Sequence, residues 1–243
     1  MKIDINCDVG EGIANEYLLM PYISSCNIAC GGHFGDKNTI DKSIQLAIGN
    51  EVLIGAHPSF LDKENFGRKV MPISKEELQI SIQNQMDLFL ERLAKFNVKL
   101  HHIKPHGALY NLIAVDERAA KNFIESILKY TKNVLLYVPY NSVIKKVALK
   151  NNIQIKYEAF ADRNYNNDLT LVARNQENAV LKNPEEVLKH VCKMALYQKV
   201  KTISNVDKEI KADTFCIHGD NEKSLEILEF LSKELAKKGI EIG

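Results

Sequence analysis

The chain has 243 residues, of which 45% are hydrophobic and 26% are charged, a balance typical of a globular protein with a core of normal size. That composition argues against intrinsic disorder. The formal net charge of +1, with 32 basic and 31 acidic side chains and no basic patch interleaved with aromatic residues, argues against nucleic-acid binding.

Short apolar runs alternate with longer amphipathic segments along the whole chain. Strands are expected at Lys2–Asn6, Ser25–Ala29, Leu53–Ala56, Leu100–Ile103, Val134–Val138, Ile153–Glu158 and Asp213–Ile217. Helices are expected at Lys37–Gly49, Ser74–Phe96, Asp116–Tyr130, Ser142–Asn151, Pro184–Gln198 and Asn221–Lys238. Ser74 followed by Glu77 is a capping-box signature, and Gly239 is suited to end the last helix.

About seven strand–helix repeats, with no internal repeat or linker between them, predict one parallel α/β domain over residues 1–243. For a chain of this length a closed (β/α) barrel fits better than an open sheet. A doubly wound open sheet is the alternative, because the periodicity alone does not choose between the two.

No apolar run approaches the roughly 20 residues that a bilayer-spanning helix needs, so no membrane association is expected. The first ten residues are too polar for the core of a signal peptide, and we therefore expect a cytoplasmic protein. The five cysteines are odd in number and include no C-x-x-C pair, which favours free thiols over a disulfide framework or a zinc ribbon.

Polar segments rich in Gly, His, Asp and Asn follow most of the predicted strands. They are Asn6–Gly12, Cys30–Asp36, His57–Phe60, Lys104–Tyr110, Phe160–Tyr165 and His218–Asp220. Five of the seven histidines lie in or beside them: His33, His57, His102, His106 and His218. The carboxyl ends of parallel barrel strands share one rim, where active sites are built, so we predict a functional site there.

Each of these residues also has an ordinary structural explanation. A single histidine after a strand is more often a hydrogen-bonding group than a catalyst, and Asp8, Asp36 or Asp220 could simply cap helices. These explanations become less convincing when all the segments fall on one rim. No P-loop, G-x-G-x-x-G, G-x-S-x-G or H-E-x-x-H motif is present to assign the chemistry directly.

In and just before the fourth polar segment, every second residue from 102 to 106 is a histidine or a lysine. His102, Lys104 and His106 share parity and point to one side while the chain stays extended. If that side is the barrel interior, the buried lysine needs a carboxylate partner. We expect it from Asp8, Glu11 or Asp162.

The polar segments, taken together, resemble the LamB/YcsF family, and the resemblance runs from residue 2 to about residue 242. The motifs that carry it are Asn6–Gly12, Asn27–Gly31 with His33, Gly55–Phe60, Lys104–Asn111, Phe160–Arg163 with Tyr165, Ala212–Thr214 and His218–Asp220. The resemblance implies a (β/α) barrel related to polysaccharide deacetylase and TIM barrels, often with seven strands.

The resemblance also implies a hydrolase that takes part in cleaving 5-oxo-L-proline to L-glutamate, coupled to ATP hydrolysis to ADP and phosphate. It implies ATP with Mg²⁺ through a complex with two further subunits, B and C. Phosphorylation of the lactam oxygen, followed by attack of water, would explain the coupling. Such a site needs a general base, oxyanion donors and a cationic clamp.

We assign catalytic roles to Asp8, His57, Lys104 and His106. Asp8 and either histidine are candidates for the base, and Lys104 with Arg163 for the clamp. Substrate-binding roles are expected for Glu11, His33, Asp162, Arg163, His218 and Asp220.

Two alternatives remain open. One is a metal-dependent deacetylase or amidohydrolase acting on a small amide or sugar, in which Asp8, His57 and His106 would hold the metal. The other is a non-catalytic protein that binds substrate for its partners.

Overall fold

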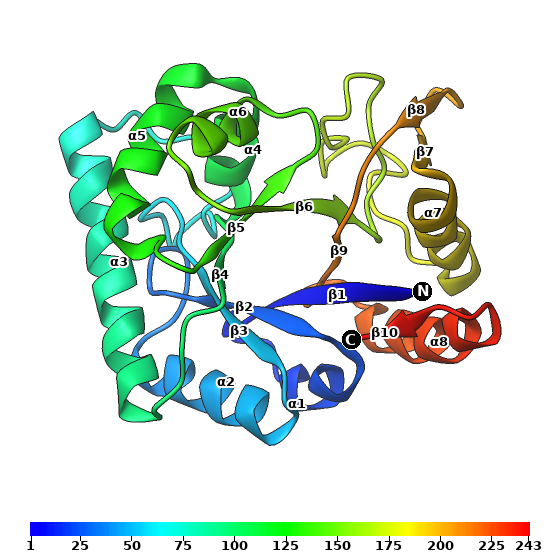
Figure 1. The fold of residues 1–243 in the computed structure, drawn as a ribbon, viewed down its shortest axis with the longest axis horizontal. Helices are drawn as coiled ribbons and strands as arrows, with labels where there is room; N and C mark the ends of the chain where they lie inside the picture. The colour runs from blue at the N-terminus through cyan, green and yellow to red at the C-terminus, as the bar shows by residue number, and fades with distance from the viewer.

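The computed structural model describes residues 1–243, and its centre is a closed barrel of seven parallel strands surrounded by helices (Figure 1). The ring runs β1-β2-β3-β4-β5-β6-β9 and closes because β1 pairs with both β2 and β9. This closure confirms the predicted barrel and excludes the open sheet.

The strands of the ring occupy the predicted apolar runs. They are β1 (Lys2–Val9), β2 (Ser25–Ala29), β3 (Leu53–His57), β4 (His102–Ile103), β5 (Leu135–Pro139), β6 (Ile155–Phe160) and β9 (Thr214–His218). The principal helices are α2 (Lys37–Gly49), α3 (Lys75–Lys95), α4 (Gly107–Val115), α5 (Glu117–Ile127), α6 (Val143–Lys150), α7 (Pro184–Tyr197) and α8 (Ser224–Lys237).

The remaining elements are short. They are α1 (Glu16–Leu19), β7 (Lys199–Lys201), β8 (Asp207–Glu209), β10 (Glu241–Ile242) and the 3₁₀ turns Met20–Tyr22 and Leu128–Tyr130. Helix α4, the β7–β8 hairpin and β10 were not predicted from the sequence. The predicted fourth strand was too long, since only two residues of that run pair with both neighbours. No helix combines the length and apolar character needed to cross a bilayer.

Helix starts follow the predicted capping chemistry. Ser74 accepts a hydrogen bond from the Glu77 amide, and the Glu77 side chain accepts one from the Ser74 amide, which completes the capping box of α3. Asp36 caps α2 in the same reciprocal way with Thr39. Asp220 caps no helix, because α8 begins after Lys223.

Most of the apolar core lies between the strands and the helices. Along β1, Ile3, Ile5, Cys7 and Val9 are buried in this core. Asp4, Asn6 and Asp8 alternate with them, and their buried polar side chains face the barrel interior. This alternation separates a dry apolar shell from a polar centre.

The polar side chains inside the barrel are joined in layers. In the lowest layer, Asp4 accepts hydrogen bonds from Ser25 and Thr214. In the next, Asn27 donates to Asn6 at 2.7 Å and accepts from His102 at 2.7 Å. Because these groups are buried, each hydrogen bond compensates for water lost on folding.

Gly55 on β3 makes room for the His102 ring. A Cβ atom at this position would lie 2.1 Å from His102 Nε2 and 2.3 Å from Cε1. The ring cannot easily move away, because it stacks on Tyr137 with centroids 4.0 Å apart and bonds to Asn27. A glycine is therefore required at this position for steric reasons.

We expect Gly55→Ala to lower the free energy of unfolding by about 1–3 kcal/mol, the usual cost of overpacking a filled interior. Urea denaturation followed by circular dichroism would measure it. The matched control is Gly49→Ala at the end of α2, where nothing lies within 4 Å of an added Cβ. That control should change stability by less than about 1 kcal/mol. Equal stability of Gly55→Ala and the unsubstituted protein would contradict the steric role.

Candidate active site

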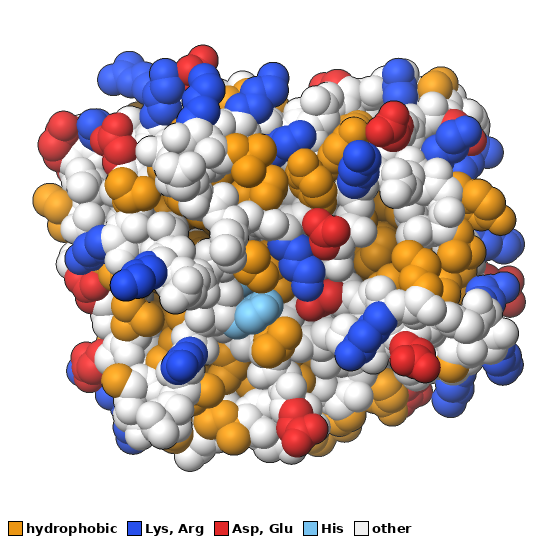
Figure 2. Space-filling view, viewed as in Figure 1, with side chains coloured by type: hydrophobic (Ala, Val, Ile, Leu, Met, Phe, Trp, Pro, Cys, Tyr) orange, Lys and Arg blue, Asp and Glu red, His pale blue; other side chains and the backbone are white.

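A cavity of about 300 Å³ opens at the rim formed by the carboxyl ends of the strands. Charged and polar side chains dominate its lining. They include Asp8, His57, Arg68, Lys104, His106, Arg163, Arg174 and His218. Figure 2 shows acidic and basic side chains interspersed over one face of the molecule, in line with the net charge of +1.

Lys104 follows β4 and is fully buried beneath this cavity. Its Nζ lies 2.8 Å from Asp8 Oδ1 and 2.9 Å from Glu158 Oε1. Burial alone would lower the pKa of Lys104, but the negative charges of Asp8 and Glu158 raise it well above its usual value. Lys104 therefore stays protonated. The expected partner Asp8 is joined by Glu158, which was not singled out in the sequence.

Asp8 connects Lys104 to the histidines. Its Oδ1 also accepts a hydrogen bond from Asn27 at 2.8 Å, and its Oδ2 lies 3.5 Å from His57 Nε2. Burial opposes ionisation, yet His57 in its protonated form, together with Lys104, brings the pKa of Asp8 well below its usual value. Asp8 is consequently a carboxylate at neutral pH.

His218 at the end of β9 is held by Asp162. Its Nδ1 lies 2.8 Å from Asp162 Oδ1, while Asp162 Oδ2 accepts from the His218 amide and from Asn221. Burial would raise the pKa of Asp162, but these contacts lower it, so the carboxylate accepts and His218 Nδ1 donates. Neutral His218 then has its lone pair on Nε2, and the ring borders the cavity.

Asp162 was expected to bind substrate, but it is fully buried and both its oxygens are engaged by protein groups. Its position is that of a residue that orients His218. Asp220, also expected to bind substrate, pairs with Arg68 and with Arg174, the latter at 3.2 Å. This pairing holds two arginines at the edge of the cavity.

Arg163 extends from the end of β6 into the same cavity. Its Nε donates to the Ala179 carbonyl and its Nη2 to the Val172 carbonyl, which ties it to the loop after β6. Burial lowers the pKa of Arg163 to about 10, so the guanidinium stays charged at neutral pH. Nη1 forms no hydrogen bond within the protein and is available to a ligand.

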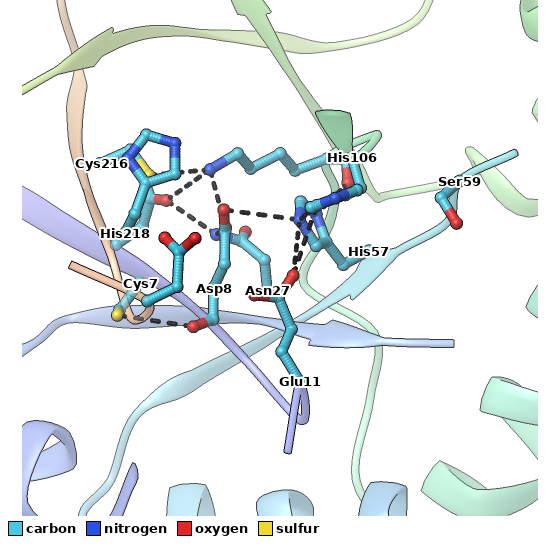
Figure 3. Close-up of polar contacts among 12 residues, drawn as sticks. Cys7, Asp8, Glu11, Asn27, His57, Ser59, His106, Cys216 and His218 are labelled. Carbon is cyan, nitrogen blue, oxygen red and sulfur yellow. Dashed lines mark hydrogen bonds and ion pairs between the residues drawn. The ribbon is translucent and has the colours of Figure 1, made fainter. Parts of the chain in front are cut away.

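Beside Asp8, the chain turns after β1 and places Glu11 among three histidines. Its Oε1 lies 2.8 Å from His33 Nε2, 3.3 Å from His106 Nδ1 and 3.9 Å from His57 Nε2. All four residues are buried. Figure 3 shows Glu11 pointing toward His57 and His106, with Asp8 on the adjacent side.

The three histidine rings are packed against one another. His33 and His106 stack with centroids 3.7 Å apart, and His57 meets His106 edge-on at 4.8 Å. Burial lowers the pKa of His33 to about 2 and that of His106 well below its usual value, while burial and Asp8 raise the pKa of Glu11. Within this cluster, a positive charge on His33 or His106 alone, or a negative charge on Glu11 alone, is therefore unfavourable.

A second cavity of about 300 Å³ adjoins the first, with Tyr110 and Phe160 lining both. Its lining is more apolar and includes Glu158 and Leu169. Lys104 and Glu158 thus lie between the two spaces. Neither Tyr110 nor Glu158 was predicted as a site residue. Glu158 and Phe160 are two residues apart on one strand and so point to the same face, a sequence pattern that could have indicated that Glu158 faces the barrel interior.

The chain matches a known family over nearly its whole length. The profile of the LamB/YcsF family matches residues 3–243. The A subunit of 5-oxoprolinase from Alkaliphilus metalliredigens is 38% identical over 246 residues, covering 99% of this chain and 96% of that protein. The corresponding A subunit from Pyrococcus abyssi is 38% identical over 247 residues, covering 100% of this chain and 97% of that protein.

A solved structure is similar over the same extent. The lactam utilization protein from Thermus thermophilus superposes with a TM-score of 0.92 at 31% sequence identity, covering 100% of this chain and 99% of that one. The likeness therefore extends over the whole barrel and the loops that build its rim.

We expect Lys104→Met to lower the free energy of unfolding by about 3–5 kcal/mol, because it leaves Asp8 and Glu158 as buried carboxylates without their cation. Urea denaturation at neutral pH measures the loss. Adding Glu158→Gln to Lys104→Met should restore part of it. The matched control is Lys37→Met, whose exposed pair with Glu91 is worth at most about 1 kcal/mol. A loss no greater than that of the control would mean that Lys104 does not hold the interior together.

Proposed function

The chain belongs to the LamB/YcsF family, and from that premise we propose that it is the A subunit of an ATP-dependent 5-oxoprolinase, which hydrolyses 5-oxo-L-proline to L-glutamate. The observation that carries the proposal is the rim cavity, about 300 Å³ in volume. It combines an Asp162–His218 pair with Lys104 and arginines in a space large enough for a five-membered lactam acid.

The cationic side chains suit a substrate that bears a carboxylate. Arg163 presents Nη1 to the cavity while its other nitrogens are fixed to backbone carbonyls. Arg68 and Arg174 lie at the edge of the same cavity, held by Asp220. Guanidinium groups bind carboxylates by paired, charge-assisted hydrogen bonds, so we assign the carboxylate of 5-oxo-L-proline to this side.

His218 is the group best placed to move protons. Its Nε2 lone pair would accept a proton from the water that attacks the lactam carbonyl carbon. As the ring C–N bond breaks, the same nitrogen would return that proton to the departing amine. Asp162 would hold the tautomer and stabilise the imidazolium through Nδ1, at 2.8 Å.

Negative charge gathers on the oxygens around the reacting carbon during this attack, and Lys104 would supply a fixed positive charge from the lining of the cavity. Asp8 would keep that ammonium in place at 2.8 Å. In this proposal Lys104 and His218 act directly on the reaction, Asp8 positions Lys104, and His57 and His106 form the adjoining wall of the cavity.

Opening a stable lactam needs a source of free energy, and ATP with Mg²⁺ would supply it by phosphorylating the lactam oxygen. After attack of water and cleavage of the C–N bond an acyl phosphate would remain, and its hydrolysis would release phosphate and L-glutamate. The chain has no P-loop motif, so we assign ATP binding to the assembled complex with subunits B and C. The relatives are named as one lettered subunit of 5-oxoprolinase, which supports a multi-subunit enzyme. We place the complex in the cytoplasm.

The test is release of glutamate from 5-oxo-L-proline, with and without ATP, by this chain alone and with its candidate B and C subunits. ATP-dependent release by the mixture supports the proposal. Release without ATP by the isolated chain would favour the amidohydrolase alternative. Binding of 5-oxo-L-proline with no effect of rim substitutions on the assembled enzyme would favour the non-catalytic alternative.

In the assembled enzyme we expect His218→Gln to lower kcat by about 10²–10⁴-fold with a much smaller change in KM, because the imidazole moves protons in the reaction. Steady-state kinetics with 5-oxo-L-proline measures both constants. His190→Gln is the matched control, since it removes an imidazole from α7, outside the cavity. If His218→Gln retained the kcat of the control, the proton-transfer role would be wrong.

A further inference from the structure

We propose that Glu11, His33, His57 and His106 form a binding site for one divalent transition-metal ion, with zinc the ion that suits them best. The site lies beside the cavity assigned to 5-oxo-L-proline and does not depend on that assignment. It differs from the metal set expected from the sequence, because Glu11 and His33, not Asp8, complete it.

The protonation of His57 and His106 follows from their outer contacts. His57 Nδ1 lies 2.7 Å from the Lys104 carbonyl oxygen, and His106 Nε2 lies 2.9 Å from the Phe66 carbonyl oxygen. A carbonyl oxygen only accepts hydrogen bonds, so each of these nitrogens carries the ring proton. The other nitrogens, His57 Nε2 and His106 Nδ1, are then bare, and they face each other at 2.9 Å.

His33 is fixed in the same way by a hydroxyl group. Its Nδ1 lies 2.9 Å from Ser59 Oγ, and the Ser59 hydroxyl hydrogen is already donated to the Phe60 carbonyl at 2.9 Å. With its hydrogen assigned to that carbonyl, Ser59 Oγ accepts from His33 Nδ1. The lone pair of His33 is left on Nε2, where it faces Glu11 Oε1 at 2.8 Å.

Three imidazole lone pairs and one carboxylate oxygen thus converge in a buried space, with all four atoms within 4.8 Å of one another. Four such acceptors repel unless a positive species lies among them. Without a metal ion, pairing these atoms takes two protons in a buried space, one between Glu11 and His33 Nε2 and one between His57 Nε2 and His106 Nδ1. One divalent cation satisfies all four at once.

The spacing fits tetrahedral coordination. Zinc–nitrogen bonds of about 2.0–2.1 Å place tetrahedral ligand atoms roughly 3.3–3.4 Å apart. Four of the six separations between these atoms, 2.8, 2.9, 3.3 and 3.9 Å, lie around that value, and all six are within 4.8 Å. Imidazole ligands favour zinc and its neighbours in the first transition row over Mg²⁺ or Ca²⁺.

The histidine nitrogens that face away from the proposed metal ion make the hydrogen bonds that are typical of metal sites. Metal-bound histidines characteristically donate their second N–H to a carbonyl, carboxylate or water, which fixes the tautomer and aims the ring. Here Ser59, the Lys104 carbonyl and the Phe66 carbonyl each accept one such hydrogen. His57 and His106 also line the cavity, so the bound ion would border it.

The first test is the metal content of the full chain, purified without a histidine tag and measured by inductively coupled plasma mass spectrometry. We expect about one transition-metal ion per chain after dialysis against metal-free buffer. Protein stripped with a chelator should take up one Zn²⁺ and then unfold at a higher temperature. One Co²⁺ should give the strong visible absorption of a four-coordinate site, a readout that needs no variant.

Substitutions locate the site. Glu11→Gln and His33→Gln should each weaken Zn²⁺ binding by at least about 100-fold, and Ser59→Ala, which removes only an outer contact, by about 10–100-fold. His190→Gln, which also removes one imidazole, should bind Zn²⁺ as the unsubstituted chain does. Circular dichroism would show that the variants are folded.

Two results would overturn the proposal. One is an unsubstituted chain that takes up no stoichiometric Zn²⁺ or Co²⁺. The other is one-to-one binding that folded Glu11→Gln and His33→Gln retain at full strength. Neither result bears on glutamate release, so a failure here is distinguishable from a failure of the proposed enzymatic function.

Discussion

The ammonium group of Lys104, buried between Asp8 and Glu158, ties three parts of the barrel together. Asp8 lies on β1, Glu158 on β6, and Lys104 follows β4, so one positive charge joins segments far apart in the sequence. A buried charge is tolerated only when oppositely charged and polar groups surround it. The residues around Lys104 are therefore constrained in both identity and direction.

That constraint continues down the barrel axis. Asn27 donates to both Asp8 and Asn6 and accepts from His102, and the ring of His102 needs the space left by Gly55. Satisfied polar networks of this kind specify one arrangement, because any shift in register leaves buried groups unpaired. The apolar shell outside the strands contributes burial without such directional demands.

The rim above this network is divided into two chemically different parts. On one side, His218 is backed by Asp162 and accompanied by arginines, an arrangement suited to proton transfer next to a bound anion. On the other, the potential ligand atoms of Glu11 and three histidines lie within 4.8 Å of one another. Asp8 lies between the two and contacts both Lys104 and His57, so the two parts share one carboxylate.

The sequence by itself determined most of the elements and the side of the molecule that carries the chemistry. The alternation in β1 places Ile5 and Asn6 on opposite faces, and polar residues directly after strands must gather at one rim of a parallel barrel. Only the tertiary structure decided that Glu158 is the second partner of Lys104 and that Asp162 supports His218 instead of facing the cavity. These outcomes depend on barrel closure and strand register, which bring together residues far apart in the chain, and no local pattern encodes such contacts.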